Sequence, residues 1–134
     1  MTNENIKLNF LHVCDYVSFD KSGKLNILGI FENIGVKKFP AVHPQMFIVT
    51  NIIVKKHGEF REVIKIIDDE NNNIVDPLEF NLKFPSSRQE KQVKFGAIAQ
   101  LNNIKFEKAG VYKVQVWVNN SQLDESLLNV NILK

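Results

Sequence analysis

Hydrophobic and polar residues alternate along most of this chain, and the alternation predicts β-strands. Between residues 78 and 84, apolar side chains alternate with polar ones, as in a strand with one buried face. The same period of two recurs over residues 93–101, 112–118 and 128–132, and it begins the chain at residues 6–10. Stretches that alternate less strictly but are rich in β-branched and aromatic residues are 11–19, 25–34, 46–55 and 60–68. We therefore expect eight or nine strands.

Turn-forming residues separate these stretches by short distances. Gly, Pro, Asn, Asp and Ser gather between the strands, for example at residues 20–23 and 119–120. Short links favour antiparallel neighbours, and many short strands without intervening helices indicate a sandwich or a barrel. Tyr112 follows a glycine turn at Gly110, which is typical of the tyrosine corner of immunoglobulin-like sandwiches. We expect one antiparallel β-sandwich domain over residues 1–134, immunoglobulin-like or related to that fold.

The amino-acid composition limits which cellular compartment and which classes of binding partner fit this chain. With 17 basic and 15 acidic residues, the formal net charge is +2, so no overall field attracts nucleic acid or an anionic membrane. Cys14 is the single cysteine, which excludes an internal disulfide and fits a reducing compartment. The first residues lack the pattern of a secretory signal, and no apolar stretch approaches the ~20 residues of a membrane-spanning helix. These features predict a cytoplasmic protein without a nucleic-acid or membrane partner.

Several short motifs resemble those of a family of uncharacterised small bacterial proteins. The motifs are Val13-Cys14-Asp15, the run GKLNILGIF over residues 23–31, Phe39-Pro40 and Gly110-Val111-Tyr112. The resemblance covers most of the chain. It implies no activity, because that family has no established biochemical role.

Asp15 is the polar residue that fits its strand least well. It shares parity with apolar neighbours on both sides, so its carboxylate is expected to face the core, where a charge needs partners. If the turn at residues 20–23 pairs Phe19 with Leu25, Asp15 lies opposite Gly29, whose missing side chain leaves room for the carboxylate. Two interpretations stay open: a structural clasp on the backbone, or a binding role.

Catalytic and metal-binding patterns are weak in this sequence. His12 and Cys14 share a strand face, but side chains two residues apart on a strand are separated by ~7 Å, too far for the hydrogen bond that activates a thiol. The other histidines, His43 and His57, lie in separate segments without metal-ligand spacing. Residues 68–76 imitate a calcium loop, but strands rather than helices flank them, which favours a solvated turn. We expect no catalytic residue, no metal and no cofactor.

Trp117 is the strongest candidate for a binding residue. It shares a strand face with Lys113 and Gln115, whereas the alternate residues of that strand are apolar. This face is therefore expected to point outward, and tryptophan is enriched at protein interfaces and as a stacking surface. A covering loop or an opposing sheet is the structural alternative.

These observations favour binding over catalysis. The first hypothesis is a non-enzymatic binding or adaptor domain that presents a sheet face or its end loops to a protein partner. That partner includes a second copy of the chain, bound through the same face or an exposed edge strand. The alternative is a small-ligand or carbohydrate-binding module that uses Trp117 as a stacking platform. An enzyme built on Asp15 and His12 ranks last, because their opposite parity sends them to opposite sheet faces.

Overall fold

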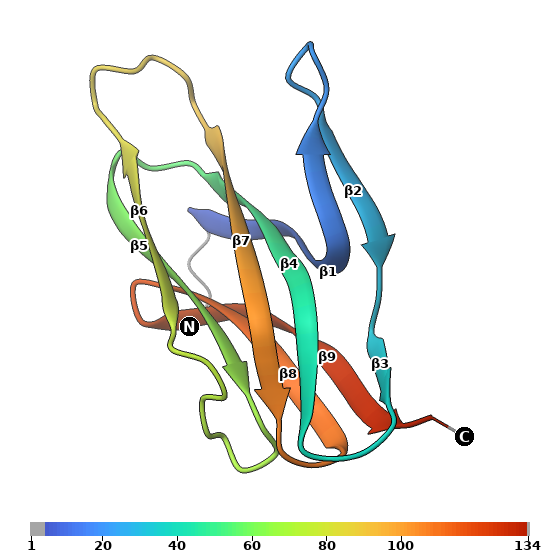
Figure 1. Ribbon diagram of the computed structural model, residues 1–134. Coiled ribbons are helices and arrows are strands. Elements are labelled where there is room, and N and C mark those ends of the chain that lie inside the picture. The colour runs from blue at the N-terminus through green and yellow to red at the C-terminus, as the bar shows by residue number, and fades with distance from the viewer. Residues whose placement is uncertain (1–4, 134) are drawn as a thin grey trace.

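Nine strands in two sheets make up the computed structural model, which describes residues 5–133 (Figure 1). The strands are β1 (Ile6–Phe19), β2 (Leu25–Ile30), β3 (Asn33–Val36), β4 (Ala41–Val54), β5 (Gly58–Ile67), β6 (Leu78–Phe84), β7 (Val93–Phe106), β8 (Gly110–Val118) and β9 (Ser121–Ile132). One sheet has the order β2-β1-β4-β7, and the other has the order β3-β9-β8-β5-β6. Neighbouring strands are antiparallel except β3 and β9, which run parallel. The predicted all-β, sandwich-like fold with eight or nine strands is confirmed.

Alternating apolar side chains from both sheets form the core. Ile48 and Ile52 of β4 have no exposed surface, and every second residue of β8 over positions 112–118 is buried. These side chains belong to two clusters, the larger containing Ile48 and Ile64 and the smaller containing Ile52 and Phe84. Removal of this apolar surface from water is the main favourable contribution to folding. The apolar residues that recur with a period of two in the sequence are therefore those that face the space between the two sheets.

A buried polar contact joins the two sheets between these clusters. Thr50 of β4 and Glu62 of β5 have no exposed surface, and Thr50 Oγ1 lies 2.6 Å from Glu62 Oε2 in a hydrogen bond. The second carboxyl oxygen, Glu62 Oε1, is buried without a hydrogen-bond partner among the described residues. Burial raises the pKa of the Glu62 carboxyl, and the hydrogen bond with Thr50 opposes this shift.

β1 leaves the four-stranded sheet partway along its length. Through Cys14 it pairs with β4, whereas the residues after Cys14 pair with β2 alone. The β1–β2 hairpin then stands apart from β4 and β7, at the upper right of Figure 1. At its base, the hairpin covers the face of β4 that points away from the main core. A third, smaller cluster forms there from Cys14, Val17, Phe47 and Val49, with Ile27 packed against it.

The connection between β7 and β8 packs against Tyr112, the residue whose position after Gly110 suggested a tyrosine corner. Tyr112 is buried, and its hydroxyl donates a hydrogen bond to the carbonyl oxygen of Lys108 at 2.6 Å. Its ring meets the ring of Phe106 edge-on, with the ring centroids 4.9 Å apart. These contacts hold the turn before β8 against the core. The immunoglobulin-like classification of the sandwich stays a prediction.

Candidate functional site

Trp117, Gln115 and Lys113 lie together on the outer face of the five-stranded sheet, as strand parity predicts. Trp117 is half-buried, and its Nε1 donates a hydrogen bond to Gln115 Oε1 at 3.0 Å. Gln115 Nε2 in turn donates to Glu125 Oε1 at 3.2 Å, and Lys113 Nζ lies 3.8 Å from Glu125 Oε2. The ammonium of Lys65 lies 4.4 Å from the centroid of the Trp117 ring. The Trp117 side chain is therefore held by its neighbours on β5 and β8.

A depression of about 340 Å³ lies beside Trp117. Its lining is rich in side-chain amides, which both donate and accept hydrogen bonds. A larger hollow of about 510 Å³ lies at β5 and β6, away from Trp117, and is lined by charged residues such as Arg61 and Lys83. The residues that line the smaller depression are Lys65, Ile67, Asn71, Asn73, Gln115, Trp117 and Gln122.

Asp15 does not join these residues, and its expected orientation toward the core is wrong. The predicted register is confirmed, because Phe19 pairs with Leu25. Asp15 also lies over Gly29: a β-carbon placed on Gly29, whose φ is +69°, would lie 2.5 Å from Asp15 Oδ2. However, Asp15 is exposed, because β1 has separated from β4 at this point and its inward parity no longer faces the core. The Asp15 carboxylate therefore stays in contact with water, and folding does not remove its hydration.

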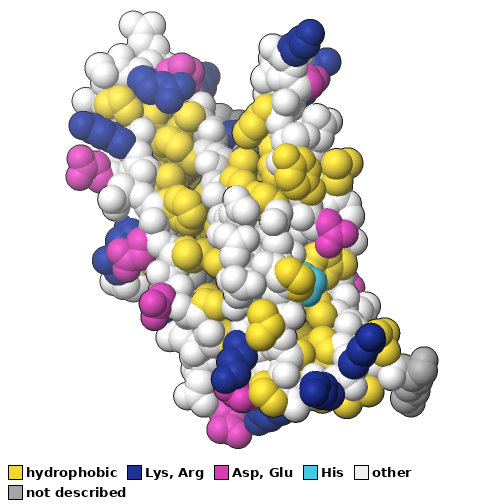
Figure 2. All heavy atoms as spheres, viewed as in Figure 1, with side chains coloured by type: hydrophobic (Ala, Val, Ile, Leu, Met, Phe, Trp, Pro, Cys, Tyr) yellow, Lys and Arg dark blue, Asp and Glu magenta, His cyan; other side chains and the backbone are white. Residues whose placement is uncertain are grey.

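The β1–β2 hairpin carries an exposed apolar surface that the sequence reasoning missed. Phe19 is 61% exposed, and Leu28 and Ile30 are each 54% exposed. Figure 2 shows hydrophobic side chains gathered on the hairpin at the upper right, below a tip with charged side chains. The available signal was the presence of apolar residues at both parities of residues 11–19 and 25–30, more than one core requires. We define the hairpin patch as Tyr16, Phe19, Leu25, Leu28 and Ile30.

His12 and Cys14 do not form a nucleophile and its base. Cys14 has no exposed surface, and its thiol donates a long hydrogen bond of 3.7 Å to the carbonyl oxygen of Tyr16. Burial raises the pKa of the Cys14 thiol, which favours the unreactive protonated form. The His12 ring stacks on Phe10 instead, with the ring centroids 5.4 Å apart.

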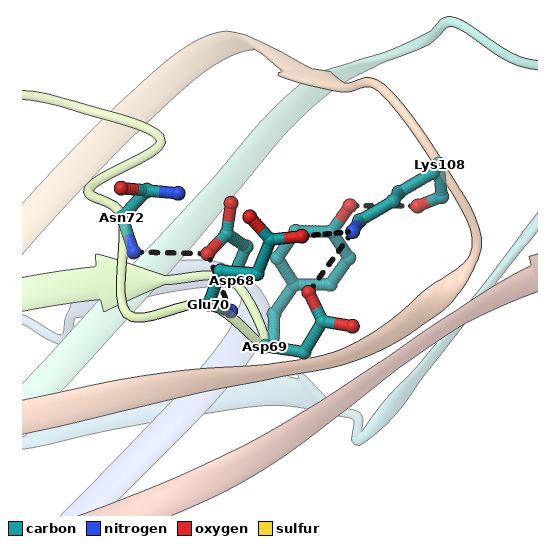
Figure 3. A network of polar contacts seen from close by, with 6 residues as sticks. Asp68, Asp69, Glu70, Asn72 and Lys108 are labelled. Atoms are coloured by element: carbon teal, nitrogen blue, oxygen red, sulfur yellow. Dashed lines mark hydrogen bonds and ion pairs between the residues drawn. The ribbon is translucent and has the colours of Figure 1, made fainter.

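The acidic loop between β5 and β6 is held by hydrogen bonds from its own backbone and by ion pairs with one lysine (Figure 3). Asp68 Oδ1 accepts hydrogen bonds from the backbone N–H groups of Glu70 and Asn72, both at 2.9 Å. Lys108 Nζ lies 3.1 Å from Asp69 Oδ1 and 3.4 Å from Glu70 Oε1. These contacts raise the pKa of Lys108, and the hydrogen bond from Asn72 lowers the pKa of Asp68. The Lys108 ammonium therefore pairs with two of the acids that imitate a calcium loop and offsets one of their two negative charges.

Residues 5–133 hold neither a cluster of metal-binding side chains nor a membrane-spanning helix. Within this range, no group of three or more His, Cys, Asp or Glu side chains is placed to hold a metal ion. The same residues contain no helix that is long and apolar enough to cross a membrane.

The comparisons with known proteins show weak likenesses. No curated protein matches the sequence. A glycosyl hydrolase family 2 member from Bacteroides cellulosilyticus DSM 14838 is 12% identical with a TM-score of 0.42, covering 66% of this chain and 13% of its own. The alkylpurine DNA glycosylase AlkC from Pseudomonas fluorescens, bound to DNA containing an abasic site analog, is 10% identical with a TM-score of 0.49, covering 95% of this chain and 30% of its own. This chain thus spans less than a third of either protein, and neither likeness carries an argument about activity.

A family model matches residues 9–131 of this chain. The model describes a family of unknown function, so the predicted resemblance to an uncharacterised family is confirmed. The chain belongs to DUF6941, a family of unknown function.

Proposed function

We propose that this protein is a non-enzymatic binding domain that engages a protein partner through the hairpin patch. The observation behind this proposal is the concentration of exposed apolar side chains on one hairpin, at the edge of the four-stranded sheet. Exposed apolar side chains gathered in one part of a protein are typical of interaction sites. The register places them on both faces of the hairpin, because the pair Phe19 and Leu25 has the opposite parity to the pair Tyr16 and Leu28. An interface built on such residues gains most from an aromatic side chain that enters a pocket of the partner, a role that Phe19 fits.

Packing contacts join the base of the hairpin to the outer face of the four-stranded sheet. Val17 and Ile27 pack against the outer face of the sheet, and the Tyr16 ring meets the Phe47 ring edge-on with centroids 5.7 Å apart. A preorganised surface loses less conformational entropy when it binds than a mobile loop does. Cytoplasmic location is part of the proposal, because the buried free thiol of Cys14 suits a reducing compartment.

A capture experiment with matched variants tests the proposal. Tagged wild type, a Phe19→Ser/Leu28→Ser variant and a Val111→Ser/Leu127→Ser variant are incubated with lysate of the source organism, and the retained proteins are identified by mass spectrometry. Val111 and Leu127 are also exposed, but they lie on the other sheet, so this variant controls for loss of surface hydrophobicity. We expect the hairpin variant alone to lose a specific protein. Equal capture by all three would refute a role for the patch.

A second candidate is a small-ligand or carbohydrate-binding module on the Trp117 face. The observation that favours it is the depression lined by Trp117 and the amides of Asn71, Asn73 and Gln122, because such sites combine a stacking ring with hydrogen-bonding groups. Lys65 over the Trp117 ring limits the free stacking area. Thermal shifts from a glycan and small-ligand panel, lost on Trp117→Ala and retained in the hairpin variant, would support this candidate. No shift from any ligand would remove it.

A further inference from the structure

Four side chains that can donate hydrogen bonds line the larger hollow, on the outer face of the five-stranded sheet. Arg61 of β5 and Asn81 of the edge strand β6 pair directly in the ladder, and Lys83 follows on the same face of β6. Asn119 lies on the other side of β5, in the turn after β8. The hollow has a volume of about 510 Å³, which is within the range of sites that bind small molecules.

A reciprocal pair of hydrogen bonds fixes Asn119 beside Arg61. The backbone N–H of Asn119 donates to the carbonyl oxygen of Arg61, and the backbone N–H of Arg61 donates to Asn119 Oδ1, both at 3.0 Å. Asn119 and Asn120 form the turn between β8 and β9, and their φ values of 48° and 69° are typical of the tightest β-hairpins. Because Oδ1 of Asn119 is already occupied, its Nδ2 amino group is the part of the side chain that is left to donate to a ligand.

The two cations of the hollow have hydrogen-bond donors that the described chain does not use. The Arg61 guanidinium has one polar contact there, with Glu79 Oε1 at 3.9 Å, which is longer than a hydrogen bond. Lys83 forms neither a hydrogen bond nor an ion pair with the residues that the structure describes. Glu59 is the acid of the lining and lies opposite Lys83 in the ladder, without an ion pair between their side chains. The hollow therefore offers a guanidinium and an ammonium to a ligand.

Two connections at the same end of the sandwich add positive charge around this hollow. A second hollow, of about 250 Å³, shares two lining residues with the first and is also lined by residues of the β4–β5 and β6–β7 connections. These connections carry four basic residues and one acid, Glu90, whose carboxylate pairs with Arg88 at 2.9 Å. The other three are Lys55, Lys56 and Lys91, and none has an ion pair within residues 5–133. Figure 2 shows Lys and Arg side chains at the upper left, around the connection between β6 and β7. Such an excess of one charge raises the local concentration of anions.

We propose that the hollow binds the phosphate group of a small molecule through Arg61, Asn81, Lys83 and Asn119. A guanidinium presents a planar fork of N–H donors that matches two phosphate oxygens, and an ammonium adds a point charge. A phosphate group has three terminal acceptor oxygens, so it occupies more of these donors than a carboxylate does. This site shares no residue with the hairpin patch or with the depression beside Trp117, so the inference goes beyond the proposed function.

The acids around Arg61 favour a single phosphate group over a nucleic acid. Glu59 precedes Arg61 on the same face of β5, and Glu79 of β6 lies on the other side of Arg61 along the strand direction. A nucleic acid carries a negative charge at each nucleotide and requires positive charge that continues along its backbone. The two carboxylates interrupt such a path and confine the attraction to the hollow.

The test is a titration of the full chain with inorganic phosphate and with glycerol phosphate, followed in proton–nitrogen correlation spectra at constant ionic strength. We expect saturable shifts of the side-chain N–H signals of Arg61, Asn81 and Asn119. Arg61→Gln should weaken binding of both probes on the order of tenfold, because it removes charged hydrogen-bond donors. Arg61→Lys keeps the charge but not the fork, so it should also bind more weakly than wild type. Lys105→Gln makes the same change of charge on β7, in the other sheet, and should bind like wild type.

Three results would overturn the inference: no saturable shift at these side chains with either probe, equal affinity of Arg61→Gln and wild type, or shifts of the same size with potassium chloride. Circular dichroism of each variant establishes that the fold is intact. Tighter binding of glycerol phosphate than of inorganic phosphate would identify a phosphate ester as the ligand, and equal binding would identify the free anion. The Phe19→Ser/Leu28→Ser variant should bind both probes like wild type, so the outcome is independent of the proposed function.

Discussion

Two hairpin turns in this protein use the same local chemistry. Asp20 and Asp68 each accept hydrogen bonds at Oδ1 from the backbone N–H groups two and four residues later, all at 2.9 Å. The residue three positions after each aspartate has a left-handed backbone, with φ of 86° at Gly23 and 65° at Asn71. Glycine, and after it asparagine, adopts this conformation at the lowest cost. The patterns Asp-x-x-Gly and Asp-x-x-Asn therefore determine both turns locally.

Replacing Gly23 with alanine tests the conformational part of this explanation. A β-carbon on Gly23 would have no atom within 4 Å, so the substitution creates no steric clash with other residues. We expect the free energy of unfolding to fall by about 1 kcal/mol, from the left-handed strain alone. Urea unfolding of wild type and the variant measures the difference. Asn71→Gly is the matched control and should raise the free energy of unfolding slightly; equal stability of Gly23→Ala and wild type would contradict the argument.

At the level of strands, alternation was sufficient to predict which residues face the core in β6, β7 and β8. It also placed Trp117, Gln115 and Lys113 on one outer face. It failed at Asp15, because strand parity identifies the core face only while a strand remains in its sheet, and β1 separates from β4 after Cys14. Strand order and the parallel pairing of β3 with β9 depend on contacts between distant segments, which local patterns do not encode.

The buried carboxyl of Glu62 was also missed, although its parity was visible. Glu62 alternates with Phe60 and Ile64 and therefore shares their inward face. Its partner Thr50 lies on another strand of the opposite sheet, so its hydrogen bond was not predictable from local sequence. The hairpin patch was missed for a related reason: apolar residues at both parities indicate either two buried faces or one exposed face, and sequence alone does not choose between them.

The Tyr112 hydroxyl provides a prediction about the connection between β7 and β8. Tyr112→Phe removes the hydrogen bond to the Lys108 carbonyl oxygen but keeps the ring that contacts Phe106. We expect the free energy of unfolding to fall by about 1 kcal/mol, the usual net contribution of such a bond. The chain contains 2 tyrosines, and Tyr16→Phe is the control, because half of the Tyr16 side chain is exposed. Denaturant unfolding of both variants should show a loss for Tyr112→Phe alone; a similar loss for both would contradict the explanation.

At the scale of the whole molecule, the Thr50–Glu62 contact stands out from the otherwise apolar packing of the two sheets. Thr50, Glu62 and Gln115 are the buried polar residues of the described chain, and Gln115 belongs to the outer face of its sheet. A buried carboxyl with one unpartnered oxygen is costly when ionised. The two sheets therefore enclose a group that is more easily ionised in the unfolded chain than in the folded one.

This difference makes global stability depend on pH in a direction that can be worked out. The pKa of Glu62 is raised in the folded state above its unfolded value, chiefly by burial. Below the unfolded pKa of about 4.3, Glu62 is protonated in both states and costs nothing. As the pH rises above that value, the unfolded state releases a proton that the folded state retains, so stability falls until the pH exceeds the folded pKa. The lowered pKa values of Asp20, Asp68 and Glu125 act in the opposite direction.

Glu62→Gln separates these opposing contributions, because it removes one titrating group and leaves the others in place. The glutamine oxygen still accepts the hydrogen bond from Thr50, so the sheets keep their contact. We expect the free energy of unfolding of Glu62→Gln, relative to that of wild type, to increase as the pH rises above about 4.3. The increase is at most about 1.4 kcal/mol per pH unit and ends once the pH exceeds the pKa of Glu62 in the folded state. Urea unfolding of both proteins across a pH series measures this difference. A constant difference at every pH would mean that Glu62 ionises equally easily in both states, and that the carboxyl between the sheets is reached by water.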